Sequence, residues 1–248
     1  MHMTIMTGAA DRPHRFFASL RRLGRDSSGV ALLELAFTMP VVLVFGLYGL
    51  ETANFAIANL KISQIALNLA DNAGRVGTTS ALSTQQLREV DINDILQAAR
   101  YHGAGIRLTT NGRITLSSLE NVQQSYDTSP VQRIHWQRCL GLKSGANYDS
   151  SYGTTTAAAG TTNTSVNAGT TVATGIGDAS GKVNAPSGAG VMFVEINYTY
   201  TPLTGTWLMK PSRLHYVASF IVRDNRDFSQ IFNPAPAASR STCDLHSS

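Results

Sequence analysis

One acidic residue, Glu34, lies inside a long apolar stretch. Residues 30–50 read VALLELAFTMPVVLVFGLYGL and contain no other charged side chain. Placing a carboxylate in the hydrocarbon of a membrane costs free energy, so a functional role is the default interpretation of Glu34, and that role requires a partner for its charge. If the chain is cut between Gly29 and Val30, the Glu34 carboxylate could neutralise the new α-amine of a neighbouring subunit, because a pair in lipid costs less than two isolated charges. The alternative is that Glu34 reaches the interface near its helix end.

The apolar stretch is long enough to cross a membrane as a helix. At ~1.5 Å per residue it covers the roughly 30 Å of a hydrocarbon core. Arginines precede it, at positions 12, 15, 21, 22 and 25. The positive-inside rule then predicts a cytoplasmic N-terminus and places everything after residue 50 on the far side.

Two other interpretations of this stretch remain open. It could be a buried helix of a large soluble protein, although the rest of the chain offers little to surround such a helix. It could also belong to a cleaved secretory signal, because Ala56-Ile57-Ala58 has the small-x-small form of a cleavage site. That second interpretation predicts a mature chain starting at Asn59.

The charge balance excludes one class of partner. The chain has 248 residues, with 20 basic and 16 acidic side chains, and charged residues make up only 15%. The sequence pI of about 9.2 alone would suggest a polyanion partner. The basic excess lies in the first 29 residues, however, next to the apolar stretch. It therefore indicates membrane topology rather than nucleic-acid binding.

Residues 21–40, RRLGRDSSGVALLELAFTMP, resemble the start of the TadE-like proteins. These are minor pilins, or pseudopilins, of the Tad (Flp) branch of type IV pili. The shared features are a basic leader with Arg21, Arg22 and Arg25, then Gly29, Glu34 five residues later, and a long apolar helix with an early proline, Pro40. The family usually has an aromatic residue directly after the glutamate, where this chain has Leu35. The block VEINYTYTPL, with the strand after it, also resembles the C-terminal part of the family.

The resemblance implies a function and a set of partners. A prepilin peptidase would cut after Gly29, and Glu34 would be the pilin glutamate needed for subunit assembly. The partners would be the major pilin, other minor pilins and the inner-membrane assembly platform of a bacterium, and the outcome would be surface adherence. Pro40 removes one helical hydrogen bond. It would either kink the helix or let it bend or melt in a filament.

The apolar helix is expected to continue beyond the membrane. Phe55, Ile62, Ile65 and Leu69 follow helical spacing, and helix-forming alanines accompany them up to Ala73. Residues 51–74 should therefore form an amphipathic extension that packs on a soluble domain. A second helix is predicted from Ser83 to Arg100, with a capping box between Ser83 and Gln86.

Alternating patterns predict a small antiparallel sheet. Residues 106–116 alternate around Asn111-Gly112 and predict a hairpin with a type I′ turn. Further strands are predicted at residues 133–139, 191–202 and 215–223. The expected fold is α+β. It comprises a cleaved cytoplasmic leader (1–29), a transmembrane helix (30–50), the helical extension (51–74) and an extracytoplasmic domain (75–248).

Residues 144–190 are rich in Gly, Ala, Ser, Thr and Asn. They should form a flexible or extended insertion with little to bury, in which Val172 and Ile176 allow a short hairpin. The insertion is either a solvated loop or a surface-contact loop. Outside the cytoplasm, Cys139 and Cys243 could form one disulfide, and two free thiols are the alternative.

No familiar catalytic or metal-binding motif is present in the sequence. His135 precedes Cys139 by four residues, but no second Cys/His pair completes a zinc site. Asp91 and Asp94 share a helical face, yet without a third ligand a solvated face is the favoured interpretation. We expect no cofactor, no metal and no catalytic residue, and hence a protein that is not an enzyme. The alternative is a signal-anchored extracytoplasmic binding protein or enzyme in which Glu34 is incidental.

Overall fold

The computed structural model describes residues 28–77 and 84–247, and the chain divides into two compact units, Met1–Leu50 and Glu51–Ser248. The elements, in chain order, are α2 (Ser28–Arg75), α3 (Glu89–Gly103), the 3-10 turn η1 (Ala104–Ile106), α4 (Leu108–Asn111), β1 (Gly112–Val122), β2 (Val131–Leu140), the 3-10 turn η2 (Ser165–Asn167), β3 (Thr170–Thr171), β4 (Ala189–Tyr200) and β5 (Ser212–Ile221).

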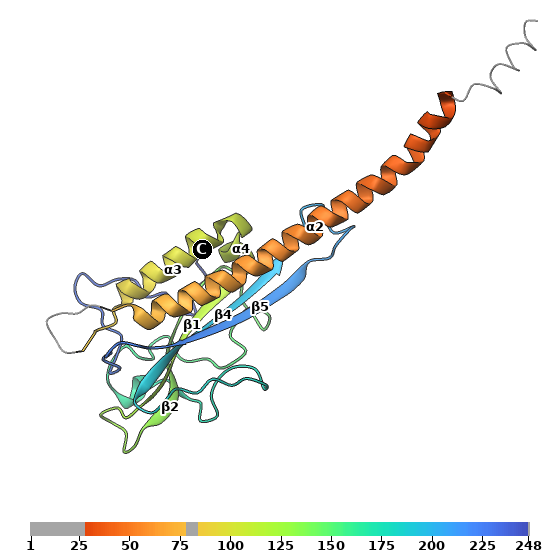
Figure 1. Cartoon of the computed structure of the whole chain (residues 1–248). Coiled ribbons are helices and arrows are strands. Elements are labelled where there is room, and N and C mark those ends of the chain that lie inside the picture. Colours follow the sequence, from red (N-terminus) through yellow and green to blue (C-terminus); the bar gives the residue numbers. More distant parts are fainter. Residues whose placement is uncertain (1–27, 78–83, 248) are drawn as a thin grey trace, which may run out of the picture. The chain divides into compact units, whose positions relative to one another are not determined.

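Helix α2 is the dominant element of the chain, with 48 residues and Pro40 inside it. The predicted helix over residues 30–74 is therefore confirmed, and it extends from Ser28 to Arg75. From Glu51 onward the helix packs with α3 on one side of the sheet (Figure 1).

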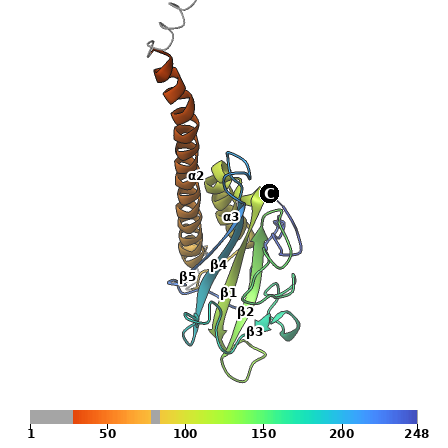
Figure 2. The ribbon, with the colours of Figure 1, turned by 90° about the vertical axis from the view of Figure 1, so that its right-hand side faces the viewer.

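All neighbouring strands of the sheet are antiparallel, in the order β3-β2-β1-β4-β5 (Figure 2). Together with α2 this makes an α+β fold, as the sequence predicts. The register of β1 and β2 shifts between Ser118 and Leu119, which leaves one extra residue on β2 at His135. The strict alternation predicted for β2 is therefore wrong at this point: Ile134 and Trp136 belong to different core clusters.

The main core lies between the helices and the sheet. Ile62, Ile65 and Leu69 of α2 are buried there with the even-numbered apolar residues of β4, from Met192 to Tyr200. Phe55 is half-buried against Tyr200, with ring centroids 5.2 Å apart. The predicted core-facing stripe of α2 is thus confirmed.

The insertion covers the second face of the sheet. Ile176 and Ala185 are buried in a cluster with Val191 and Phe193 of β4, so the expectation that the insertion has little to bury is wrong. Polar side chains of the sheet also bind its backbone: the Glu195 carboxylate accepts hydrogen bonds from the N–H and hydroxyl of Ser151. Most strand residues are buried because both faces are covered.

Two local predictions are wrong. The second helix begins at Glu89 rather than Ser83, and the Asp91 carboxylate accepts a hydrogen bond from the Arg88 N–H at 3.0 Å at its start. Asp91 is therefore a buried capping residue and not part of a solvated face, whereas Asp94 is exposed. Ser83 itself lies outside the described residues.

Residues 106–111 are helical turns rather than a strand. Arg107 adopts the left-handed conformation with φ 53°, and Leu108 is buried in the core below it. Gly112 has an extended φ of −153°, so it starts β1 rather than completing a type I′ turn. A Cβ at Gly112 would approach the Asn197 carbonyl oxygen to 2.5 Å, which explains a glycine at this point of close strand packing.

Candidate functional site

The four residues predicted for processing and assembly that the structure describes all lie on α2. Gly29 and Val30 are in its first turn, and Glu34 and Pro40 follow within the exposed apolar part. The first N–H groups of a helix have no intrahelical acceptor, so the Gly29–Val30 bond lies where the helix is held least firmly. Arg21, Arg22 and Arg25, with the rest of the predicted leader up to residue 27, lie outside the described residues.

The Glu34 side chain is exposed and lacks a partner. Among residues 28–77 and 84–247, no group hydrogen-bonds or pairs with its carboxylate. Only its backbone is engaged, because the Thr38 hydroxyl donates to the Glu34 carbonyl at 2.8 Å. Glu34 is therefore a carboxylate without a partner among the described residues.

Pro40 leaves α2 continuous. Its missing N–H deprives the Ala36 carbonyl of its usual donor, and one turn earlier Thr38 bonds back to Glu34, a contact that often bends helices. The helix nevertheless continues past Pro40 without a break. A kink at Pro40 stays a prediction.

Within the described part of the chain, α2 is the one helix long and apolar enough to cross a membrane, judged by length and composition. The most apolar part of α2 has no buried side chains. A signal sequence near an N-terminus passes the same test, so this finding establishes a candidate single span and nothing about its orientation.

Beyond the candidate span, α2 carries a second apolar stripe that sequence reasoning missed. Ile57, Leu60 and Leu67 are 59%, 63% and 42% exposed, although they belong to the part of α2 that packs on the sheet. Their spacing of three and seven residues places them on one face, opposite Ile62 and Ile65. The signal was present in the sequence as apolar residues spaced by three and seven, beside the core-facing ones.

Among the exposed side chains around this stripe, charge is confined to the C-terminal end of α2, where the exposed Arg75 pairs with the half-buried Asp71 at 2.8 Å. Between Thr52 and Gly74, the exposed side chains are all apolar, small or neutral polar, namely Thr52, Ala53, Ala56, Ile57, Asn59, Leu60, Gln64, Leu67, Asn68 and Asn72. The outer face of a helix in a soluble domain normally carries charges. From Thr52 to Asn68 the exposed side chains are uncharged, and exposed apolar residues at heptad-like spacing in such a stretch are typical of a helix that packs against another helix.

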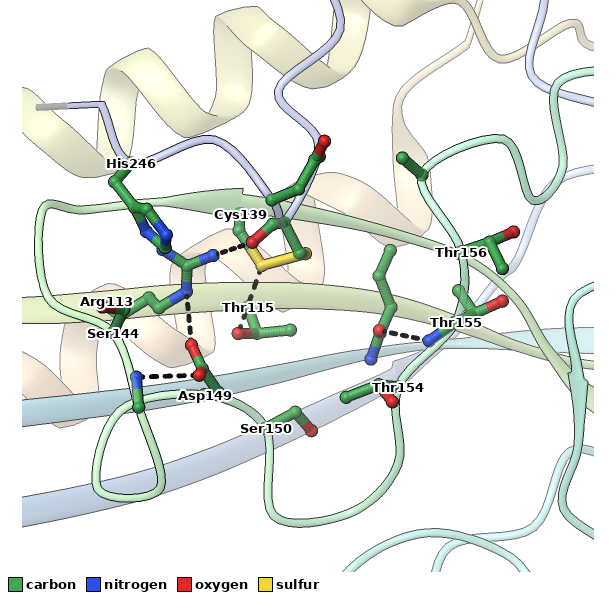
Figure 3. A pocket seen from close by; sticks show the side chains of 15 residues that line it. Arg113, Thr115, Cys139, Ser144, Asp149, Ser150, Thr154, Thr155, Thr156 and His246 are labelled. Carbon is green, nitrogen blue, oxygen red and sulfur yellow. Dashed lines mark hydrogen bonds and ion pairs between the residues drawn. A yellow bond between two sulfur atoms is a disulfide. The ribbon is translucent and has the colours of Figure 1, made fainter.

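A polar cavity of about 470 Å³ lies on the other side of the sheet. Figure 3 shows Arg113 at one end, the disulfide between Cys139 and Cys243 beside it, and the side chains of Thr154, Thr155 and Thr156 toward the other end. The two cysteines are thus bridged, which is the pairing favoured from the sequence.

The buried guanidinium in this cavity is occupied by the protein itself. Arg113 donates to two carbonyl oxygens after β2 and to the Cys243 carbonyl, and its Nη1 lies 2.7 Å from His246 Nδ1. Its Nε pairs with Asp149 at 3.3 Å. Burial lowers the pKa of Arg113, and the Asp149 carboxylate partly opposes that effect. Arg113 therefore ties the C-terminal tail to the sheet rather than awaiting a ligand.

A buried Ser–Glu–His cluster does not have the geometry of a catalytic triad. The Ser118 hydroxyl donates to Glu120 at 2.7 Å, and His135 Nδ1 lies 2.8 Å from the other Glu120 oxygen. The serine thus contacts the carboxylate instead of the imidazole. A nucleophile must contact its base, so this arrangement does not activate Ser118.

Within residues 28–77 and 84–247, no three His, Cys, Asp or Glu side chains cluster in a way that could hold a metal ion. Cys139 forms the disulfide and does not act with His135 as a ligand pair.

Comparison of the chain with protein-family models, with curated proteins and with solved structures gives no match.

Proposed function

We propose that this protein is a pilin-like minor subunit of a Tad-type bacterial filament, similar to the TadE-like proteins. In this proposal a prepilin peptidase cuts the chain after Gly29. Residues 30–50 cross the inner membrane, and α2 then packs against helices of other subunits. The protein acts through assembly and has no catalytic role.

The observation that carries the proposal is the exposed apolar stripe on the outer face of α2. Ile57, Leu60 and Leu67 expose apolar surface to water in a domain whose other helix face is already packed. Exposed apolar surface at heptad-like spacing is stabilised when it meets a second helix. A plain membrane anchor needs no such face beyond the span.

Glu34 supports the same proposal from inside the span. Its carboxylate has no partner within the described chain, and an isolated charge in hydrocarbon costs a few kcal/mol. The α-amine created by cleavage before Val30 on a neighbouring subunit would supply the missing positive charge. Pairing would therefore favour assembly over a lone subunit in lipid.

The charges and the disulfide support one orientation. Arginines before residue 30 favour a cytoplasmic N-terminus, which places Glu51–Ser248 on the extracytoplasmic side. The bridge between Cys139 and Cys243 fits that side, because disulfides persist in oxidising compartments. The proposed partners are the prepilin peptidase, the major pilin, other minor pilins and the inner-membrane platform.

Replacement of Glu34 by glutamine tests the proposal. We expect Glu34→Gln to be inserted and cut like the wild type, but to be lost from the sheared filament fraction, because the neutral side chain cannot pair with the amine. Thr38→Ala, one turn away on the same helix, is the matched control and should assemble normally.

Incorporation of the Glu34→Gln variant at the wild-type level would contradict the proposal. It would favour a signal-anchored extracytoplasmic binding protein or enzyme, in which the glutamate is incidental. Intact mass of the membrane-bound chain distinguishes a failure of cleavage from a failure of assembly.

A further inference from the structure

The loop between β4 and β5 exposes two large apolar side chains. Leu203 is 69% exposed and Trp207 is 64% exposed. The indole is held in place, because Trp207 Nε1 donates to the Thr204 carbonyl at 2.7 Å. Gly205, with φ +87°, provides the turn between them. The loop therefore presents a fixed apolar tip to solvent.

A buried carboxylate on α2 fixes this loop. Glu51 accepts hydrogen bonds from the Leu203 and Thr204 N–H groups at 3.0–3.2 Å, and from the Thr204 hydroxyl at 2.9 Å. The Tyr200 hydroxyl donates to it at 2.5 Å. The helix and the loop tip thus meet at a single fully hydrogen-bonded residue.

Glu51 directly follows the candidate span in the chain. Residues 30–50 cover about 31 Å at ~1.5 Å per residue, close to the hydrocarbon thickness of a bilayer. The residue after Leu50 therefore lies at the boundary between hydrocarbon and headgroups whenever the span is inserted. The loop that Glu51 holds must lie near the same boundary.

From this geometry we propose that the β4–β5 loop is a membrane-interface anchor that inserts Leu203 and Trp207 into the lipid headgroup region. Tryptophan favours that region because its ring is apolar while its N–H is polar. Transfer of the leucine side chain from water into this region lowers its free energy, because apolar surface is removed from water. The inference rests on the membrane span of the proposed function, but not on filament assembly.

The charges around the loop suit a lipid surface. Lys210 lies exposed at the end of the loop, and a cavity of about 480 Å³ beside Leu203 is lined by Arg107. Lys61 Nζ lies next to Gly105 of the same cavity wall. None of the described residues that line the cavity is acidic. Basic groups at this level attract headgroup phosphates, most strongly those of anionic lipids.

Tryptophan fluorescence of the full chain in vesicles tests the inference. The chain has two tryptophans, and Trp136 is buried in the protein core, so Trp207→Phe removes the signal of the loop alone. The vesicles contain phosphatidylethanolamine and phosphatidylglycerol, with bromine placed either near the headgroups or deep in the acyl chains. Co-flotation with the vesicles reports insertion of the span.

We expect the wild-type chain to float with the vesicles and to show a blue-shifted component that shallow bromine quenches more than deep bromine. Trp207→Phe should lose that quenched component. Val166→Trp in the Trp207→Phe chain is the matched control: Val166 is 89% exposed on the insertion, and its tryptophan should keep a water-like, unquenched emission.

Three results would overturn the inference. Unquenched, water-like emission of Trp207 in floating protein would show that the loop stays in water, while leaving the proposed span intact. A blue shift without quenching, growing with the protein-to-lipid ratio, would assign the loop to a neighbouring subunit. If the chain does not float with the vesicles, α2 does not insert into the bilayer, and both proposals are contradicted.

Discussion

At the scale of single residues, the two glutamates of α2 have opposite environments. Glu51 is buried and accepts hydrogen bonds from a tyrosine, a threonine and two backbone N–H groups. Glu34 is exposed and has no partner in the described chain. A satisfied carboxylate holds a structure together. A carboxylate within an apolar segment that has no partner among the described residues is available to pair with another subunit, as the proposed function expects.

Glu51→Gln should destabilise the domain in a pH-dependent way. Burial acts to raise the pKa of Glu51, but the hydrogen bonds from Tyr200, Thr204 and Leu203 outweigh it, so its pKa in the fold is below the ordinary value. Because the pKa of Glu51 is lower in the folded protein, the ionised carboxylate stabilises the fold at pH values above 4.5, the ordinary pKa. This stabilisation is lost as the pH falls through the lower pKa of the folded state.

We therefore expect the free energy of unfolding of the wild type to exceed that of the Glu51→Gln variant by about 1–3 kcal/mol at pH 7. The gap should shrink below pH 4.5. Denaturant unfolding of the full chain in detergent at several pH values measures it. Asp94→Asn, which removes an exposed carboxylate, should stay within about 0.5 kcal/mol of the wild type. A gap between wild type and Glu51→Gln that does not change with pH would contradict this account.

The disulfide could be predicted because the chain has only two cysteines, Cys139 and Cys243, in a domain expected outside the cytoplasm. Processing at Gly29 and an assembly role for Glu34 stay predictions. The role of Glu51 could not be predicted in this way. Its partners lie 149 to 153 residues further along the chain, and nothing in the local sequence indicates that Tyr200 will meet α2. The second helix starts after Arg88 rather than at Ser83 for a similar reason. The backbone of Phe232, from the distant C-terminal segment, hydrogen-bonds the backbone on either side of Arg88.

At the scale of elements, α2 has two apolar faces with different tasks. The face with Ile62 and Ile65 closes the core, and the opposite face with Ile57 and Leu60 is open to solvent. Helical periodicity predicted the first face because every soluble domain needs one. It did not reveal the second, since the pattern alone does not tell which apolar residues a sheet will cover.

Lysine on the open face should block assembly without unfolding the domain. Leu60→Lys alters a side chain that is 63% exposed, so stability should change by no more than about 0.5 kcal/mol. A charge on a face that packs against another helix should remove the protein from the filament fraction. Thermal unfolding in detergent and the composition of sheared filaments measure the two effects.

Two matched variants complete the test of the open face. Val166→Lys places the same charge at an exposed apolar position on the insertion and should assemble normally. Ile62→Ala, in the core-facing stripe, should lose about 2–5 kcal/mol of stability. Normal assembly of the Leu60→Lys protein would contradict a packing role for this face.

The disulfide fixes the C-terminal tail to β2. Cys139 and Cys243 are 104 residues apart, and backbone hydrogen bonds from Cys139 to Ser241 and from Gly141 to Ser247 continue the attachment. Replacing both cysteines by serine should cost on the order of 4–5 kcal/mol in the chain-entropy model of cross-links. Urea unfolding of the oxidised protein and of the double variant, both in detergent, measures the loss.

The same comparison under reducing conditions is the control for the disulfide. The reduced wild type should then approach the stability of the double variant. A double variant as stable as the oxidised wild type would contradict the account, because it would show that the tail is held by its hydrogen bonds alone.

Errors at the element scale have a common cause. Asn111-Gly112 has the composition of a hairpin turn, but Leu108 is drawn into the core and keeps the preceding residues helical. The insertion has few apolar residues, yet Ile176 and Ala185 suffice because Glu195 and Asn197 of the sheet bind its backbone. Tertiary contacts overrode local propensity in both segments.

At the scale of the whole molecule, the chain combines a candidate membrane span with a sheet domain held on the continuation of the same helix. Helix α2 also carries two glutamates and the open apolar face, and the β4–β5 loop has an apolar tip. Membrane insertion, processing and lateral helix packing explain these features together. A soluble enzyme or a simple anchored domain would explain only some of them.

The most direct test is the N-terminal sequence and intact mass of the protein isolated from the membranes of its own cells. The account predicts a chain that starts at Val30 and retains the disulfide between Cys139 and Cys243. A chain that starts at Asn59 would instead show an ordinary signal peptide. An uncut chain would show an anchored domain, and either result would contradict processing as a pilin.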